Sequence, residues 1–363
     1  MQEVGSEFSL PTEYLREKNT NQFAEYSDYP AKVFLSSGRG ALRLIAKGLK
    51  ARKGDEVLLP SYLCKEVVKP FRDELLKLKF YKVDETLRVD IDDLRNKVGR
   101  KTRALLFIHY FGFPQTATRK IKSLCEGRIF VIEDLVQSFL TRHQGKVLGS
   151  IGDATVSSYR KWIPIPDGAL LGINNTSFHT PPVKRILPDK NLYVRSRLRG
   201  LELKGSCLKQ PTFSKETFRR LFLSADKLLD TTPVEMSDHS RRMLSKFDFD
   251  AIISRRRANF CYLLSHLVDF KSAPPFYRKL PAGVCPLGFP ILAEDRDGLK
   301  KMLIKNRIYP PIHWKLPSEV DKEEFSASWQ ISKHILTIPI DQRYKTEDMQ
   351  FVADTIGKFE ATT

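Results

Sequence analysis

A regular alternation of apolar runs and amphipathic helical segments constrains this 363-residue chain most, and it extends from about residue 31 to residue 175. Leu42 and Ile45 recur at helical spacing, and Lys53-Gly54-Asp55 then turns the chain into the apolar run Glu56-Val57-Leu58-Leu59. Strands separated by helices are typical of a mostly parallel, buried sheet. Ligands of such sheets collect at the carboxyl ends of the strands, so residues that follow strands are the first candidates for a site.

The same periodicity predicts the other elements of the chain. In the first half, helices are expected near Cys64–Leu75, Ile91–Val98 and Thr116–Cys125, and strands near Leu78–Val83, Ala104–His109, Phe130–Asp134, Ala154–Ser158 and Ala169–Ile173. After residue 240 we expect a long helix that continues to Leu267, and then elements near Leu287–Leu292, Arg296–Lys305, Ile308–Trp314, Ile335–Ile338 and Thr346–Phe359. This order predicts an N-terminal arm (residues 1–30), a large α/β domain (residues 31–240) and a small C-terminal α/β domain (residues 241–363).

The segment between residues 180 and 240 is different. It is rich in Lys, Arg and Leu, and its pattern predicts a helix at Lys215–Leu229, but nothing in it indicates a place in the sheet. We therefore treat it as an atypical insert or a substrate region.

Charge and cysteine content narrow the classes of protein. Lys and Arg outnumber Asp and Glu by 61 to 43, so the net charge of +18 attracts anions. The excess is densest near Lys184–Arg199 and Arg255–Arg257 without a compact nucleic-acid motif, which makes nucleic acid an unlikely partner and favours solvated surface or an anionic small substrate. Five scattered cysteines without C-x-x-C spacing argue against a disulfide framework or a zinc site.

Location follows from what the sequence lacks. No apolar run approaches the ~20 residues of a membrane helix, and the polar, acidic first residues do not resemble a secretory signal. We expect a soluble, cytoplasmic protein without a membrane span.

An acid and a lysine provide the strongest functional clue. The apolar run Phe130-Val131-Ile132 ends in Glu133-Asp134, and Lys161 lies 27 residues beyond Asp134, after another expected strand. A pyridoxal phosphate site needs such a pair, because a carboxylate holds the ring nitrogen and a lysine bonds to the aldehyde. Taken singly, Asp134 could instead cap a neighbouring backbone, and Arg160-Lys161 could be a surface pair.

Other segments fit the same cofactor but also have simpler explanations. Small residues at Ser36–Gly40 precede a helix, which suits either a phosphate or an ordinary helix cap. Ser157 and Ser158 could add hydroxyls to a phosphate cup or pack on a strand face. His109 at a strand end could contact a ligand or be a satisfied core histidine. Tyr309 and His313 lie in a stiff aromatic segment that could line a substrate mouth or pack internally.

Taken in order, these segments resemble the DegT/DnrJ/EryC1/StrS family of pyridoxal-phosphate-dependent sugar aminotransferases, within the type I (aspartate aminotransferase) fold. The resemblance covers residues 33–175 and, less closely, 308–359. Its landmarks are Ser37-Gly38-Arg39-Gly40-Ala41-Leu42, Gly54-Asp55-Glu56-Val57, Val83-Asp84, His109-Tyr110-Phe111-Gly112, Ile132-Glu133-Asp134 with Gln137, Gly149-Ser150-Ile151-Gly152-Asp153, Lys161 ahead of Asp167-Gly168, and Leu336–Ile340.

The resemblance assigns roles to individual residues. It implies that Lys161 bonds to the cofactor aldehyde, Asp134 pairs with the ring nitrogen and Gln137 lies on the side of the ring hydroxyl. The phosphate would be held by Ser157 or Ser158 and by the amides of the segment Gly38, Arg39 and Gly40. Cys64 would face the ring, and Tyr62 is the alternative for that contact. Independently of the resemblance, their local sequence makes His109, Tyr309 and His313 the candidates for contacts with the substrate.

The resemblance also implies a reaction and an assembly. An amino donor, often glutamate, would load the cofactor, and a keto sugar, usually nucleotide-linked, would accept the amino group for polysaccharide or other glycan biosynthesis. A homodimer is implied as well.

The chain departs from the family pattern at several positions. Arg39 stands where Ser or Thr is usual, Cys64 where an aromatic residue commonly stacks on the ring, and Ala169 where a glycine is common. The family's glycine-asparagine substrate loop is not found between residues 180 and 240. Two alternatives remain: a dehydratase, although dehydratases of this family carry histidine in place of Lys161, and a degenerate cofactor-binding regulator or polyanion binder without turnover.

Overall fold

A seven-stranded sheet forms the centre of the computed structural model, which describes residues 3–10, 22–125, 127–187, 190–209 and 215–361. Its strand order is β2-β10-β9-β6-β5-β3-β4. All neighbouring strands are parallel except β10, which is antiparallel to both β2 and β9. The strands are β2 (Ala31–Leu35), β3 (Glu56–Pro60), β4 (Lys77–Tyr81), β5 (Thr102–Ile108), β6 (Phe130–Asp134), β9 (Ala154–Ser158) and β10 (Ala169–Ile173).

The middle strands are apolar and are covered on both faces. In β5, β6 and β9 every residue that faces the interior is nearly inaccessible, as Leu105, Val131 and Val156 illustrate with 0% exposure. Parallel strands need this double cover because their crossover helices lie on the sheet faces. The predicted mostly parallel α/β fold is therefore confirmed.

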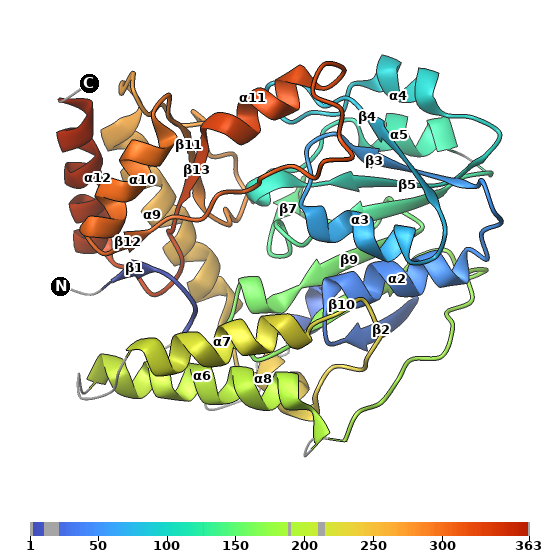
Figure 1. Cartoon of the computed structure of the whole chain (residues 1–363), viewed down its shortest axis with the longest axis horizontal. Coiled ribbons are helices and arrows are strands. Elements are labelled where there is room, and N and C mark those ends of the chain that lie inside the picture. The colour runs from blue at the N-terminus through green and yellow to red at the C-terminus, as the bar shows by residue number, and fades with distance from the viewer. Residues whose placement is uncertain (1–2, 11–21, 126, 188–189, 210–214, 362–363) are drawn as a thin grey trace.

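Four helices connect these strands close to their predicted positions: α2 (Gly38–Gly48), α3 (Lys65–Arg72), α4 (Ile91–Lys97) and α5 (Thr118–Cys125). Helices α2 and α3 contact each other, as do α4 and α5 (Figure 1). Side-chain caps fix two of the starts: Ser37 Oγ accepts the Gly40 N–H at 3.1 Å, and Asp90 caps α4.

A pair of long helices fills the segment that the sequence left unplaced. Helices α6 (Leu192–Lys209) and α7 (Lys215–Leu228) lie side by side below the sheet in Figure 1. Leu201, Phe218 and Phe222 bury a small core between them, together with Phe8 from the N-terminal segment. The predicted helix Lys215–Leu229 is confirmed as α7, whereas α6 was not predicted.

The C-terminal part combines helices with short strands. Its elements are α8 (Asp238–Leu244), α9 (Phe249–Leu267), β11 (Phe289–Leu292), α10 (Arg296–Lys305), β12 (Ile308–Tyr309), α11 (Ser326–His334), β13 (Ile335–Ile338) and α12 (Thr346–Glu360). The strand β1 (Val4–Gly5) pairs in parallel with β12, which brings the N-terminal segment into this part. A short helix α1 (Gln22–Glu25) and the hairpin β7 (Arg142–His143) and β8 (Lys146–Val147) complete the described elements.

The single long helix expected after residue 240 is wrong. The chain breaks between α8 and α9, where Asp248 has an extended backbone and its side chain accepts the Ala251 N–H at 3.0 Å. Such a cap starts a new helix instead of continuing the old one. The division into an arm and two domains remains a prediction. Within the described residues, no helix is both long and apolar enough to cross a membrane.

Two glycines of α6 allow the packing of the helix pair to be tested. A Cβ on Gly200 would lie 2.9 Å from Phe222 Cε1, whereas a Cβ on Gly205 would meet nothing closer than 3.8 Å. Alanine in a helix interior normally stabilises by about 1 kcal/mol over glycine. We expect Gly205→Ala to raise the free energy of unfolding and Gly200→Ala to lower it by roughly 1–3 kcal/mol, because the Phe222 ring must shift. Urea unfolding followed by circular dichroism measures both, and equal gains would contradict close packing at Gly200.

Candidate functional site

Asp134 is a buried carboxylate without a cation beside it. It ends β6, is 4% exposed, and its Oδ1 accepts the Val136 N–H at 2.8 Å. Burial raises the pKa of Asp134 to about 6, although the Val136 amide and the positive charge of Lys161 act in the opposite direction. A buried carboxylate of this kind gains stability from a cationic ligand, such as a protonated ring nitrogen.

Lys161 ends a short 3-10 turn, Tyr159–Lys161, directly after β9. Burial lowers the pKa of its amine, although Cys64 and Asp134 act to raise it. Within the described residues, this amine has no hydrogen bond or ion pair. A desolvated and uncommitted amine is a good nucleophile towards an aldehyde.

Gln137 offers a free donor near Asp134. Its Oε1 accepts the Phe111 N–H at 2.9 Å, which fixes the orientation of the amide group. Its Nε2 is buried and has no partner among the described residues. Because an unsatisfied buried donor costs about 1–3 kcal/mol, the position fits an acceptor oxygen of a ligand.

The start of α2 lies against the strand ends. A Cβ on Gly38 would be 3.6 Å from Val136 Cγ2, 3.7 Å from Val156 Cγ1 and 3.9 Å from Ser158 Cβ. The first amides of a helix have no partner within it and attract anions. Because the Gly40 amide is already capped by Ser37, Gly38 and Arg39 are the amides left for a phosphate.

The two candidate serines project from opposite faces of β9, because side chains alternate along a strand. Ser158 shares the face of Val156 and lies beside Gly38, whereas Ser157 is on the other face. Ser158 is therefore the serine that the fold brings to the start of α2.

We call Asp134, Gln137, Ser158, Lys161 and the start of α2 the cradle. Arg39 and Cys64 lie beside it. Arg39 Nη1 donates to the Leu229 carbonyl at 2.9 Å and pairs with Glu66 at 3.0 Å, so its side chain ties α2 to neighbouring segments. Cys64 precedes α3, and burial raises the pKa of its thiol. A neutral thiol gives the site a small apolar surface where the family commonly has an aromatic ring.

His109 is committed to the protein's own structure, so the predicted substrate contact finds no free ring nitrogen here. The ring is fully buried, its Nδ1 accepts the Gln115 N–H at 2.9 Å, and its Nε2 lies 2.9 Å from Glu133 Oε1. Glu133 in turn accepts backbone N–H groups of Gly149, Ile151 and Gly152. Nε2 therefore supports the loop after the hairpin through Glu133, and Nδ1 holds the segment after β5 through Gln115.

A cleft of about 870 Å³ is lined by Lys161 and, from the C-terminal part, by Tyr309 and His313. That these two residues form a substrate mouth remains a prediction. Burial and the nearby Lys161 lower the pKa of His313 to about 3, so this imidazole is neutral at physiological pH. Its Nδ1 lies 3.0 Å from Thr337 Oγ1. Asp134 and Gln137 are outside the lining, which makes Lys161 the residue common to the cradle and the cleft.

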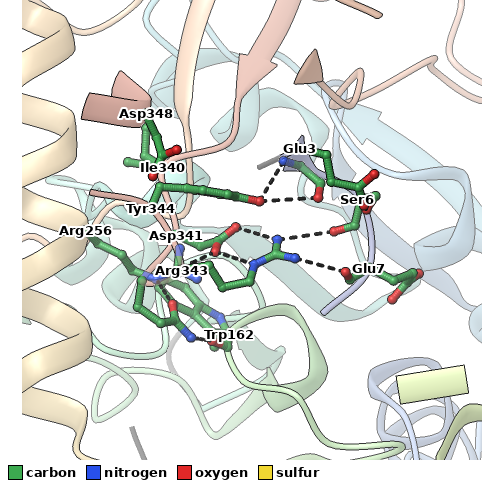
Figure 2. A network of polar contacts seen from close by, with 12 residues as sticks. Glu3, Ser6, Glu7, Trp162, Arg256, Ile340, Asp341, Arg343, Tyr344 and Asp348 are labelled. Carbon is green, nitrogen blue, oxygen red and sulfur yellow. Dashed lines mark hydrogen bonds and ion pairs between the residues drawn. The ribbon is translucent and has the colours of Figure 1, made fainter. Parts of the chain in front are cut away.

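Two residues that the sequence did not single out, Gln342 and Arg256, hold the turn after Lys161. Gln342 Nε2 donates to the Trp162 carbonyl at 2.7 Å, and Arg256 Nε donates to Gln342 Oε1 at 3.0 Å. The Arg256 guanidinium also lies 4.8 Å from the centroid of the Trp162 ring (Figure 2). Arg256 belongs to the basic run 255–257, and nothing in that run distinguishes a buried arginine from its surface neighbours.

The buried groups fit pyridoxal phosphate on these observations. Asp134 lacks a cation, Gln137 Nε2 lacks an acceptor, and the Lys161 amine is uncommitted within the part of the chain that the structure describes. The α2 start supplies amides for a phosphate beside them. Together they match the ring nitrogen, the ring hydroxyl, the aldehyde and the phosphate of one cofactor.

Comparison with known proteins points in the same direction. A model of the DegT/DnrJ/EryC1/StrS aminotransferase family matches residues 15–174. A GDP-4-keto-6-deoxy-D-mannose 3-dehydratase of Escherichia coli O55:H7 is 30% identical over 312 residues, which cover 81% of this chain and 75% of the relative. A GDP-perosamine synthase of Escherichia coli O157:H7 is 27% identical over 166 residues, 45% of this chain and 46% of the relative, so this match spans less than half of that enzyme.

The fold recurs in a solved structure, a putative sugar aminotransferase, Spr1654, from Streptococcus pneumoniae. Its PMP form has a TM-score of 0.69 and 16% identity over 97% of this chain and 92% of that chain. The same protein was also solved in a PLP form. The predicted type I fold is confirmed by this likeness, and the predicted cofactor agrees with the family.

Replacement of Asp134 tests whether its burial carries a cost that only a ligand relieves. Folding raises the pKa of Asp134 from 3.8 to about 6, so the ionised carboxylate destabilises the ligand-free fold by on the order of 2–3 kcal/mol above pH ~6. That cost shrinks as the pH falls from about 6 towards 3.8 and is gone below 3.8, where Asp134 is protonated in both states. We expect ligand-free Asp134→Asn to unfold at a higher temperature than wild type at pH 7.5.

The same variant should lose the stabilisation that added pyridoxal phosphate gives the wild type. Thermal unfolding with and without cofactor, at pH 7.5 and pH 5, measures both effects. Asp153→Asn is the matched control, because Asp153 lies on the loop before β9 and pairs with Lys122. Lower ligand-free stability of Asp134→Asn at pH 7.5 would contradict an unrelieved carboxylate.

Proposed function

Because the chain belongs to the DegT/DnrJ/EryC1/StrS aminotransferase family, we propose that it is a pyridoxal-phosphate-dependent aminotransferase that transfers an amino group to a nucleotide-linked keto sugar. The observation that carries this proposal is the pairing, at adjacent strand ends, of the buried Asp134 carboxylate, which has no ion pair, with the partly buried and uncommitted Lys161 amine. This combination suits a cofactor with a cationic ring and an aldehyde.

The cradle residues hold the cofactor in this proposal. Asp134 would face the ring nitrogen and keep it protonated, and Gln137 Nε2 would donate to the ring oxygen. Ser158 and the amides of Gly38 and Arg39 would hold the phosphate. When bound, the cofactor supplies an electrophilic aldehyde and a ring that accepts the electron pair left by proton removal.

Lys161 is the acid–base group in this proposal. Its lowered pKa leaves more of the amine neutral near neutral pH, so Nζ can take a proton from the Cα of the amino donor and, in the second half of the reaction, give a proton to the sugar carbon that receives the amino group. His313, on the cleft wall, has a pKa of about 3 and therefore does not add a positive charge beside this amine. The side chain that can act as base at this place is Lys161.

Dehydration of a keto sugar is the alternative, because one relative that is 30% identical over most of this chain is a 3-dehydratase by name. The residue at position 161 favours amino transfer, since the dehydratases that this family contains carry histidine in place of the lysine. The two reactions give different products, an amino sugar or a deoxy sugar, which mass spectrometry separates.

We further propose that the enzyme works as a homodimer in the cytoplasm and supplies an amino sugar for polysaccharide or glycan synthesis. The family resemblance supports the homodimer and the role in glycan synthesis. Sedimentation of the purified protein tests the dimer. A regulator that binds the cofactor without turnover would instead show colour but no response to any amino donor.

Replacement of Lys161 tests the cofactor and its attachment directly. Wild-type protein reconstituted with pyridoxal phosphate should absorb visible light, and borohydride should fix the cofactor to the Lys161 peptide, as peptide mapping would show. Lys161→Ala should lose the fixation and at least ~10²-fold of activity, because a positioned acid–base group contributes about 10²–10⁴-fold. Added glutamate should change the wild-type spectrum and leave that of Lys161→Ala unchanged.

Lys146→Ala, in the exposed hairpin, is the matched control and should behave as wild type. A colourless wild-type protein that binds no added cofactor would refute the proposal. Fixation at a lysine other than Lys161 would refute the site.

A further inference from the structure

The cleft over Lys161 carries a surplus of positive charge. Among the described residues that line it, eight are Lys or Arg and four are acidic. The four acids, Glu3, Glu7, Asp226 and Asp341, each form an ion pair with a lysine or arginine of the lining. A cleft with this balance attracts an anion more strongly than the rest of the surface, because its low-dielectric walls focus the field.

Four of the lining cations have no carboxylate partner within the described residues: Lys161, Arg219, Arg256 and Lys300. Lys161 belongs to the cradle. Arg256 is buried, and its guanidinium already donates to Gln342 and to the carbonyls of Pro286 and Leu287. Arg219 and Lys300 are therefore the two cations of the lining that are free to meet a ligand from solution.

These two cations come from helices on different sides of the cleft. Arg219 lies on α7, and Lys300 lies on α10, with the paired strands β1 and β12 between the two helices in Figure 1. Each is followed one turn later by an exposed aliphatic side chain that also lines the cleft, Leu223 (59% exposed) and Ile304 (43% exposed). Residues at i and i+4 share one face of a helix, so each wall offers one charge and one apolar surface.

We propose that Arg219 and Lys300 bind the phosphate groups of the amino acceptor from the two sides of the cleft, with Leu223 and Ile304 against its nucleoside. This rests on the proposed function and names the residues that select the nucleotide part of that substrate. Phosphates suit the pair because a guanidinium donates two parallel hydrogen bonds to one phosphate, and an ammonium binds the next as a point charge.

Helix α7 is held firmly enough to serve as a binding wall. Arg197 of α6, only 2% exposed, pairs with Glu7 at 2.8 Å and lies 5.0 Å from the centroid of the Phe222 ring of α7. Its Nε is buried without a partner among the described residues, so the guanidinium is not fully satisfied by the protein. Helix α7 lies within residues 180–240, where the family's substrate loop was not found. In this proposal Arg219 of α7 supplies the contact to the anionic part of the substrate.

Neighbouring residues provide matched controls. Arg220 on α7 and Lys301 on α10 are exposed and lie outside the cleft lining, so their removal costs the same charge without touching the cleft. The experiment compares Arg219→Ala, Lys300→Ala and the double variant with Arg220→Ala and Lys301→Ala. Each is titrated with GDP, dTDP, UDP and inorganic phosphate by calorimetry on cofactor-loaded protein.

At least one nucleoside diphosphate should bind the wild type more tightly than inorganic phosphate does. We expect Arg219→Ala and Lys300→Ala each to weaken that binding on the order of tenfold, the loss of one charge-assisted hydrogen bond, and the controls to stay within about twofold. The spectral response to glutamate should be unchanged in all variants, because the amino donor does not need the outer cleft.

The outcomes separate this inference from the proposed function. Unchanged nucleotide affinity in Arg219→Ala and Lys300→Ala, equal losses in the two controls, or a wild type that binds none of the three nucleotides would overturn the inference even if glutamate still changes the spectrum. Failure of the wild type to respond to glutamate would count against the proposed function instead. Unchanged melting temperatures confirm that the variants are folded.

Discussion

The common register of β5, β6 and β9 is the constraint on which the site depends. Ile108 pairs with Asp134, and Asp134 pairs with Val156, so β5 and β6 end at one level and β9 continues for two more residues, to Ser158. Asp134 and the turn that carries Lys161 are thereby placed at the same edge of the sheet. Because these strands are buried on both faces, a shift in register would move apolar residues to the edge and the carboxylate into the core. The packing of the sheet and the geometry of the site are therefore fixed together.

Two adjacent acids in β6, Glu133 and Asp134, have different roles: the protein binds the first, and the second is available to a ligand. Side chains alternate along a strand, and Glu133 therefore faces away from Asp134. Hydrogen bonds from His109 and from the Ile151 and Gly152 amides overcome the burial of Glu133 and hold the pKa of its carboxyl below its usual value. Asp134 accepts one backbone N–H, and burial raises its pKa. The fold satisfies the first acid completely and leaves the second for a ligand.

The sequence predicted what depends on local pattern. Apolar periodicity placed β6, α10 and α12 to within two residues, and the order of short motifs pointed to Asp134, Gln137 and Lys161. It could not tell that His109 would find Glu133 and Gln115, because a strand-end histidine has the same pattern whether it faces a ligand or the core. Helix α6 was missed because polar and apolar residues are mixed around it, and its burial comes from α7 and the N-terminal segment.

Partners far away in the sequence account for the remaining part of the site. Arg343 forms two hydrogen bonds with the Asp341 carboxylate and also donates to the carbonyls of Ser6 and Glu7, which fixes the N-terminal segment against the C-terminal part (Figure 2). Between Asp341 and Arg343, Gln342 holds the Trp162 carbonyl, one residue beyond Lys161.

Residues 341–343 therefore contact both the N-terminal segment, which lines the cleft, and Trp162, which follows Lys161. Each contact joins residues that are about 180 or more positions apart, and no local pattern can indicate them. A shift of the N-terminal segment would move Arg343, and the adjacent Gln342 would pass this movement to Trp162. This links the outer cleft, where the anionic part of the acceptor is proposed to bind, to the position of the amine at its base.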